Sequence, residues 1–227
     1  MPRSTTSTRT ALLAGATGLI GRALLAQLAE RAAYRQVTVL VRRAAADLGS
    51  AEKVDVQTID FAKLPAPFPA VDDVYIALGT TIKTAGSQQA FRRVDHDHVV
   101  AIATAARAAG AQRLAVVSAL GANRSSFVFY NRVKGEMEAA VNELGYASVV
   151  IAQPSLLVGD RAALGQPVRS AETLVAGMLQ PVMGWVPKAV RPIAAADVAI
   201  AMVDATLAGT PGRSVLGSAQ MQNARRA

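Results

Sequence analysis

The stretch Gly15-Ala16-Thr17-Gly18-Leu19-Ile20-Gly21 decides the fold. It follows an apolar run that predicts a buried strand at 10–14 and precedes an amphipathic run that predicts a helix at 19–31. Glycines at such a junction let the backbone turn sharply and approach a pyrophosphate, and the helix N-terminus adds partial positive charge. The pattern predicts a dinucleotide-binding loop, with a glycine-rich turn that serves packing alone as the alternative. Its cofactor-binding residues are Gly15, Thr17, Gly18, Leu19, Ile20 and Gly21.

The rest of the chain repeats this alternation of short apolar runs and longer amphipathic runs. Further strands are predicted at 37–41, 54–59, 74–78, 114–117 and 148–151, and helices at 90–109, 129–144 and 196–207. Strands that alternate with helices pair in parallel through right-handed crossovers. We therefore expect an α/β fold with a Rossmann-like, doubly wound parallel sheet that carries helices on both faces. Glycines and prolines interrupt the pattern after Pro154, so we expect one domain over 1–227, in which 155–227 form a short, irregular, reduced substrate-side region.

Composition excludes several classes of protein. The 227 residues are 52% hydrophobic and 18% charged, which excludes a disordered chain, and the absence of cysteine excludes disulfides and thiolate metal sites. We expect no metal site, because His96 and His98 alternate with aspartates and point to different sides of a helix. No apolar run is long enough to predict a membrane span. The net charge of +8 suggests nucleic acid, but aromatic residues are only 4% and no basic stripe is present, so we expect no nucleic-acid partner. We expect a cytoplasmic protein.

Arg42 and Arg43 follow the predicted second strand, and Arg42 lies 21 residues beyond Gly21. A dinucleotide fold that prefers NAD places an acidic residue near this position to accept a hydrogen bond from the ribose 2′-hydroxyl. Guanidinium groups cannot accept that bond, but they bind a 2′-phosphate well. The pair predicts a preference for NADP(H) over NAD(H); two solvated surface arginines are the alternative.

Tyr130 and Lys134 lie four residues apart in the run that opens the helix at 129–144. Residues at this spacing share one face of a helix. A nearby ammonium lowers the pKa of a tyrosine from its usual value of about 10, as proton exchange with a carbonyl or alcohol requires. A surface Tyr/Lys pair is the alternative, and the position of the pair after the predicted fifth strand, which ends at Ser118, favours the catalytic interpretation.

Together, the glycine spacing and Ser118, Tyr130 and Lys134 resemble the short-chain dehydrogenase/reductase superfamily, in its extended and atypical branches. Residues 78–81 and 118–136 are similar to the Tat-interacting, oxidoreductase-like subgroup and its bacterial relatives, over about residues 8–210. The resemblance implies that Tyr130 exchanges the proton, that Lys134 binds the nicotinamide ribose and tunes Tyr130, and that Ser118 binds the substrate oxygen. It also implies cofactor contacts: Asp60 with the adenine, Leu78, Gly79 and Thr80 with the ribose and pyrophosphate, and Pro154 and Ser155 beside the nicotinamide.

The sequence departs from the superfamily pattern at two places. Ser118 is followed by Ala119 rather than by a second hydroxyl residue, which makes Ser125 and Ser126 candidate substitutes. An asparagine that many members carry on the preceding helix, in support of a proton relay, corresponds to Asp95 here.

Two functions from different classes follow from these residues. The first is an NADP(H)-dependent oxidoreductase for a carbonyl, alcohol or sugar-like small molecule. The second is an NADPH-binding sensor or regulatory interaction protein with little or no turnover. A sugar-nucleotide epimerase is disfavoured, because only about 70 residues follow Pro154. Lys83, Arg124 and Arg161 could face the substrate pocket and favour an anionic ligand, and the helices at 90–109 and 129–144 could pair in a homodimer.

Overall fold

A seven-stranded, fully parallel sheet forms the centre of the computed structural model, which describes residues 9–45, 48–49, 51–158 and 187–223. The strand order is β3-β2-β1-β4-β5-β6-β9. The strands are β1 (Arg9–Ala14), β2 (Tyr34–Val41), β3 (Val54–Thr58), β4 (Asp73–Ile76), β5 (Arg113–Val117), β6 (Ser148–Gln153) and β9 (Gly212–Gly217). The order reverses direction at β1 and β4, whose carboxyl ends are the expected ligand site of a doubly wound sheet. The Rossmann-like α/β fold is confirmed.

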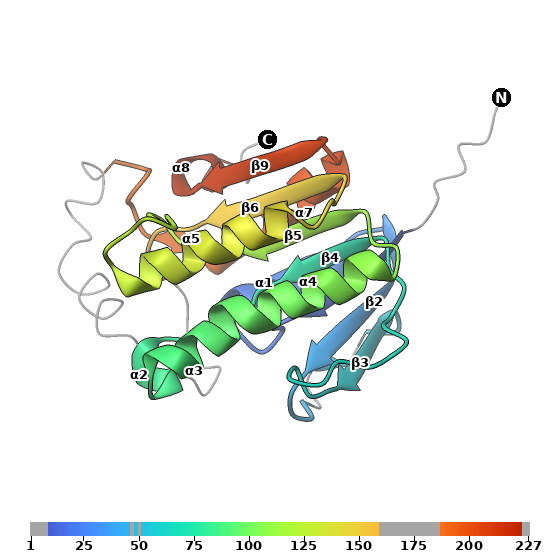
Figure 1. The fold of residues 1–227 in the computed structure, drawn as a ribbon. Coiled ribbons are helices and arrows are strands. Elements are labelled where there is room, and N and C mark those ends of the chain that lie inside the picture. The colour runs from blue at the N-terminus through green and yellow to red at the C-terminus, as the bar shows by residue number, and fades with distance from the viewer. Residues whose placement is uncertain (1–8, 46–47, 50, 159–186, 224–227) are drawn as a thin grey trace.

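Helices cover both faces of the sheet (Figure 1). Helices α1 (Leu19–Glu30) and α7 (Ala195–Ala208) pack on one face, and α4 (His98–Ala108) and α5 (Phe129–Asn142) pack on the other. Successive side chains of a strand point to opposite faces, so each central strand contributes to two cores. In β1, Leu13 joins the core beneath α1 and α7, whereas Leu12 joins the core beneath α4 and α5. This double burial explains why the strands appear as continuous apolar runs.

The single helix expected at 90–109 is interrupted, which corrects that prediction. The chain forms α3 (Gln88–Arg92), a π-helical turn at Arg93–Asp97, and then α4. A short helix, α2 (Ile82–Ala85), precedes them. A π turn holds more residues than an α turn without changing the residue types, so periodicity did not reveal it.

The C-terminal part completes the sheet with β9, an edge strand that the sequence did not predict. Its residues, GRSVLG, are half-buried or exposed and lack an apolar run. Two short strands, β7 (Leu157–Val158) and β8 (Ile193–Ala194), form a separate pair, and α8 (Ser218–Met221) follows β9. Of the helices described, none combines the length and the apolar character that crossing a membrane requires.

Candidate active site

The glycine loop joins the carboxyl end of β1 to α1 with little space to spare. Gly15 has φ of +96°, and an added Cβ would lie 2.6 Å from the carbonyl carbon of Ala77. A Cβ on Gly21 would lie 1.9 Å from the carbonyl oxygen of Gly15, whereas one on Gly18 would lie 3.4 Å from the same oxygen. Gly15 and Gly21 therefore have no room for a side chain. The loop leaves the N-terminus of α1 at the carboxyl edge of the sheet, which fits a bound pyrophosphate.

The other three loop residues differ in what they can offer a ligand. Thr17 is exposed, Leu19 is half-buried against the core, and Ile20 is buried within it. A contact between Ile20 and a cofactor would therefore come from its backbone.

Arg42 and Arg43 are exposed just beyond β2, whose last residue, Val41, pairs with Thr58 at the end of β3. The imidazole of His98 stacks edge-on against Phe61, with ring centroids 5.9 Å apart. Burial lowers the pKa of His98, the Arg42 guanidinium lowers it further, and the Asp97 and Asp60 carboxylates oppose this shift. The fold thus brings Arg42 and Asp60 to the surroundings of one histidine, where a 2′-phosphate and an adenine are expected. No sequence pattern links His98 to this group, because its neighbours here come from other strands.

The segment after β4 is tied to the π turn. The Thr80 amide donates a hydrogen bond of 2.8 Å to Oδ2 of Asp95. Gly79 is exposed, and a Cβ there would lie 3.4 Å from Oδ1 of the same carboxylate. Leu78 packs against the core beneath α4 and α5. Gly79 is therefore open at the carboxyl edge, the Thr80 amide is taken up by Asp95, and Leu78 anchors the segment in the core.

Helix α5 carries Tyr130 and Lys134 one turn apart. The Lys134 side chain is 3% exposed, and its Nζ lies 2.8 Å from Oδ1 of Asp95, which is 1% exposed. The ring of Tyr130 is half-buried and packs on Phe91, with centroids 5.4 Å apart. The predicted catalytic lysine is thus a buried cation with its own counter-ion. Asp95 was expected to matter as the counterpart of an asparagine, but its ion pair with Lys134 was not predicted.

Ser118 contacts a carboxylate, Glu138, that was not among the predicted site residues. Its hydroxyl donates a 2.5 Å hydrogen bond to Oε1 of Glu138, which also accepts from Gln153 Nε2 at 2.8 Å. The other oxygen of Glu138 lies 2.8 Å from the Arg213 guanidinium. Glu138 follows Lys134 by four residues, and this spacing was the signal that could have revealed it. Among the described residues, no hydrogen bond joins Ser118 to Tyr130.

The two substitute serines belong to the loop before α5. The Ser125 amide donates to Oδ1 of Asn123 at 2.8 Å, and the Ser126 hydroxyl accepts from the Val128 amide at 3.2 Å. The Ser126 oxygen atom is thus used to shape the loop. Ser125 is exposed.

Pro154 and Ser155 follow β6 and connect the sheet to the C-terminal part. Pro154 is buried, and its carbonyl accepts from the Leu120 amide at 3.0 Å. The Ser155 amide donates to the Ser218 hydroxyl at 2.6 Å, and the Ser155 hydroxyl donates to the carbonyl of Arg191 at 2.5 Å. The amide and the hydroxyl of Ser155 therefore both hold the C-terminal elements.

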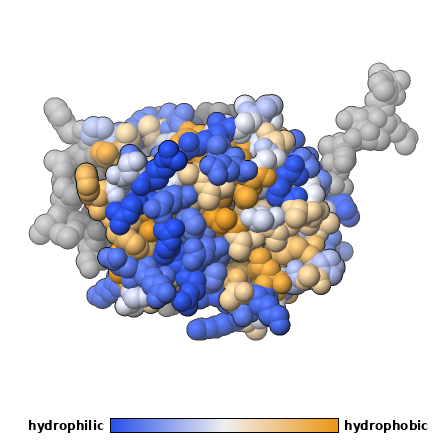
Figure 2. All heavy atoms as spheres, in the orientation of Figure 1, coloured by the Kyte–Doolittle hydropathy of each residue, from blue (hydrophilic) through white to orange (hydrophobic). Residues whose placement is uncertain are grey.

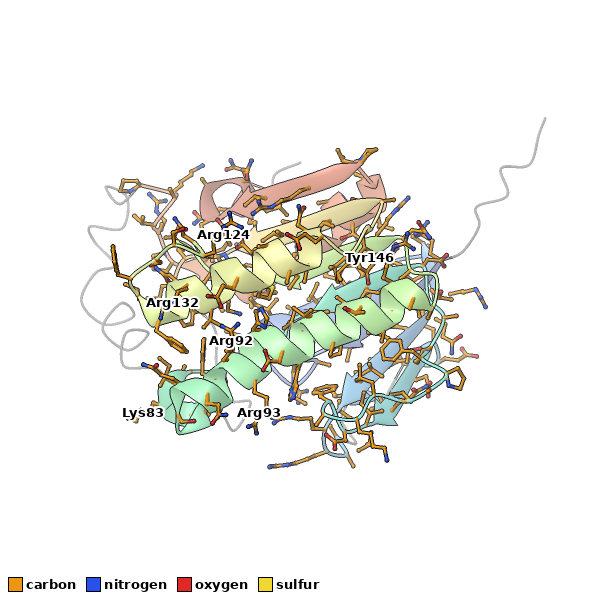
Figure 3. The ribbon with its side chains drawn as sticks, viewed as in Figure 1. Lys83, Arg92, Arg93, Arg124, Arg132 and Tyr146 are labelled. Atoms are coloured by element: carbon orange, nitrogen blue, oxygen red, sulfur yellow. The ribbon has the colours of Figure 1, made fainter. Side chains whose placement is uncertain are left out.

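Basic side chains surround the N-terminal half of α5 (Figure 3). Lys83 and Arg124 are exposed, and Arg132 lies over the Phe129 ring at 5.6 Å. Figure 2 shows hydrophilic side chains gathered over this part of the molecule. Arg161 lies outside the described residues. The part of the chain that the structure describes holds no group of three His, Asp or Glu residues suited to a metal ion.

Two relatives illustrate the similarity in sequence. Protein FMP52, mitochondrial, of Eremothecium gossypii is 37% identical over 153 residues, which cover 66% of this chain and 67% of that protein. Protein HTATIP2 of Rattus norvegicus is 34% identical over 157 residues, which cover 67% of this chain and 64% of that protein.

The names of the FMP52 relatives correct one expectation. Several of these fungal proteins are named mitochondrial, which contradicts the expected cytoplasmic localisation. The expectation had no physical basis in the composition, because a lack of cysteine is compatible with any compartment.

A solved structure and a family model also match this chain. The solved structure of MoeE5 in complex with UDP-glucose and NAD aligns with 91% of this chain and 75% of its own, with a TM-score of 0.69. The two sequences are 17% identical, so this likeness shows the fold alone. The model of an NAD(P)H-binding family matches residues 15–158, from the glycine loop to the end of β7. The chain therefore belongs to the NAD(P)H-binding family whose model it matches.

Proposed function

We propose that this protein is an NADP(H)-dependent oxidoreductase for a small carbonyl, alcohol or sugar-like substrate. The observation that carries the proposal is the buried Lys134 ammonium, one turn from Tyr130 on α5 and linked through Asp95 to the Thr80 amide. The glycine loop, with its two positions that exclude a side chain, supports a pyrophosphate site beside them.

When bound, the nicotinamide would supply or accept the hydride. Lys134 would hold the nicotinamide ribose through its ammonium. On reduction of a carbonyl, the Tyr130 hydroxyl would donate its proton to the substrate oxygen, and on oxidation of an alcohol the phenolate would take that proton back.

The preference for NADP(H) rests on Arg42 and Arg43, which are exposed and next to the expected adenine site. Titration calorimetry with NADPH and NADH tests it. We expect Arg42→Asp to weaken NADPH binding by about tenfold or more, since one charge-assisted contact is lost and a like charge faces the 2′-phosphate. NADH binding should not weaken, because the new carboxylate can accept from the ribose 2′-hydroxyl. Arg35→Asp is the matched control, because Arg35 is exposed near the opposite end of the same strand. Tighter binding of NADH than of NADPH by the unmodified protein would refute the preference.

Catalysis itself is tested with a panel of aldehydes, ketones and sugars in the presence of NADPH. We expect turnover that falls by at least about a hundredfold in Tyr130→Phe, because general acid–base catalysis contributes that much or more. NADPH affinity should change little in this variant. Full activity of Tyr130→Phe would exclude the proposed proton donor.

A second function, an NADPH-binding sensor with little turnover, is favoured by one observation. The Ser118 hydroxyl is held by Glu138, so it is committed to a protein carboxylate rather than to a substrate oxygen. Tight NADPH binding without turnover on the panel, in both the unmodified protein and Tyr130→Phe, would support this function over the first.

A further inference from the structure

Asp95 is the buried carboxylate of the π turn, and its two oxygens hold two different parts of the candidate site. Oδ1 lies 2.8 Å from Nζ of Lys134 on α5, and Oδ2 accepts from the amide of Thr80 in the segment after β4. The Asp95 side chain is 1% exposed, so its contacts are screened much less than those of a surface carboxylate. One side chain therefore joins three segments of the chain at the carboxyl edge of the sheet.

The π turn places this carboxylate. Arg93–Asp97 is wound with i→i+5 spacing between two α-helical segments, and Asp95 is its central residue. Such turns occur mostly as insertions within α-helices, often at functional sites. A Cβ on Gly79 would already lie 3.4 Å from Oδ1, so the strand end approaches the carboxylate closely.

Stability alone is a poor reason for this arrangement. Burial of an ion pair costs desolvation energy that often equals or exceeds the attraction between the charges, and apolar side chains of similar size stabilise a core equally well. The pair does, however, hold the lysine at one place and leave it little freedom to move.

We infer that Asp95 is a positioning residue for the nicotinamide half of the cofactor. It fixes the Lys134 ammonium relative to the segment after β4, because the Thr80 amide donates to the same carboxylate, so that the remaining N–H donors of the ammonium meet the nicotinamide ribose in a prearranged geometry. The inference rests on the proposed function, because it takes the site of Lys134 as the cofactor site. A purely structural role for Asp95 would affect binding of the whole cofactor. A positioning role should leave the affinity for the adenosine half unchanged.

The test compares two ligands that differ in this half. NADPH carries both halves, whereas adenosine 2′,5′-bisphosphate carries only the adenosine, its 2′-phosphate and one further phosphate. Affinities for both are measured by calorimetry for the unmodified protein, Asp95→Asn and Asp95→Ala. Asp95→Asn retains a hydrogen-bond acceptor without the charge, so it remains informative where Asp95→Ala leaves Lys134 unpaired and fails to fold.

We expect Asp95→Asn to weaken NADPH binding by about tenfold, with a larger loss in Asp95→Ala, because charge-assisted hydrogen bonds are about twice as strong as neutral ones. Affinity for adenosine 2′,5′-bisphosphate should stay within about twofold of the unmodified protein. Lys134→Met should show the same selective loss, and the Asp95→Asn/Lys134→Met double variant should lose less than the sum of the two, since both act through one pair.

Glu136→Gln is the matched control. Glu136 also lies on α5, and it forms an ion pair with Arg92 of α3, the helix that leads into the π turn. The control therefore breaks a second ion pair between α5 and the segment that carries Asp95. That pair is partly exposed, and we expect both affinities to be unchanged. Equal losses for the two ligands in Asp95→Asn, or no loss for either, would overturn the inference. If the unmodified protein bound neither NADPH nor adenosine 2′,5′-bisphosphate, the proposed function would be overturned, and the inference with it.

Discussion

Alkaline pH should destabilise this protein, because three of its four tyrosines are buried as neutral phenols. Burial is the main cause that raises the pKa of Tyr34, of Tyr75 and of Tyr146 above the usual range. The Asp73 carboxylate, which accepts a 2.9 Å hydrogen bond from Tyr34, acts in the same direction. For Tyr146 the Arg107 guanidinium opposes burial without reversing its effect.

The magnitude follows from proton linkage. Above about pH 10 an unfolded tyrosine loses its proton, whereas these buried phenols keep theirs, so the folded state binds more protons and the free energy of unfolding falls as pH rises. When the folded pKa of a tyrosine lies well above this range, the free energy of unfolding falls by about 1.4 kcal/mol between about pH 9 and about pH 11. For the three tyrosines the fall is about 4 kcal/mol.

Tyr146→Phe isolates one of these contributions. The variant loses the hydrogen bond from the Tyr146 hydroxyl to the Ala103 carbonyl, 2.6 Å long, and should be about 1 kcal/mol less stable than the unmodified protein at neutral pH. Near pH 11 the free energy of unfolding of the unmodified protein has fallen by about 1.4 kcal/mol because of Tyr146, and the variant has no such loss. The variant should therefore become the more stable of the two.

Urea unfolding followed by far-UV circular dichroism, from about pH 8 to about pH 11, measures this difference. Subtracting the two proteins cancels the titration of every other group. Tyr146→Leu is the control: it should be less stable than Tyr146→Phe at every pH, because it removes packing, but show the same pH dependence. A difference between Tyr146→Phe and the unmodified protein that stays constant over this range would refute the reasoning.

Three further predictions concern the site. Gly21→Ala should abolish measurable NADPH binding in calorimetry, because its Cβ would lie 1.9 Å from the Gly15 carbonyl oxygen and force α1 away from the loop; retained affinity would contradict the role of the loop. Ser118→Ala should lower the free energy of unfolding by about 1–3 kcal/mol, since Glu138 loses a buried hydrogen bond, while NADPH affinity measured in parallel stays the same. Burial lowers the pKa of His98 in the folded state, so the unfolded state binds the proton more readily, and the free energy of unfolding should fall as pH drops below about 6.5. Chemical denaturation of His98→Gln should show a weaker fall over the same pH range. An unchanged pH dependence in this variant would argue against the assignment to His98.

Much of the fold could be predicted because its determinants lie close together in the chain. The glycine loop, the apolar strands and the amphipathic helices are patterns of a few residues each, and all six predicted strands are present. The strand β9 was missed, since an edge strand with exposed residues needs no apolar run. The π turn was missed because an extra residue in a helical turn leaves the composition unchanged.

The sequence by itself determined that the chain forms a doubly wound sheet with a glycine loop at its switch point, since local backbone and burial rules suffice for that. Only the tertiary structure decided how the polar groups of the site are paired. Lys134 meets Asp95, and Ser118 meets Glu138, through the packing of α5 against the π turn and β5. Such partners are distant in the sequence, and a buried charge or hydroxyl takes whichever partner the packed helices bring within reach.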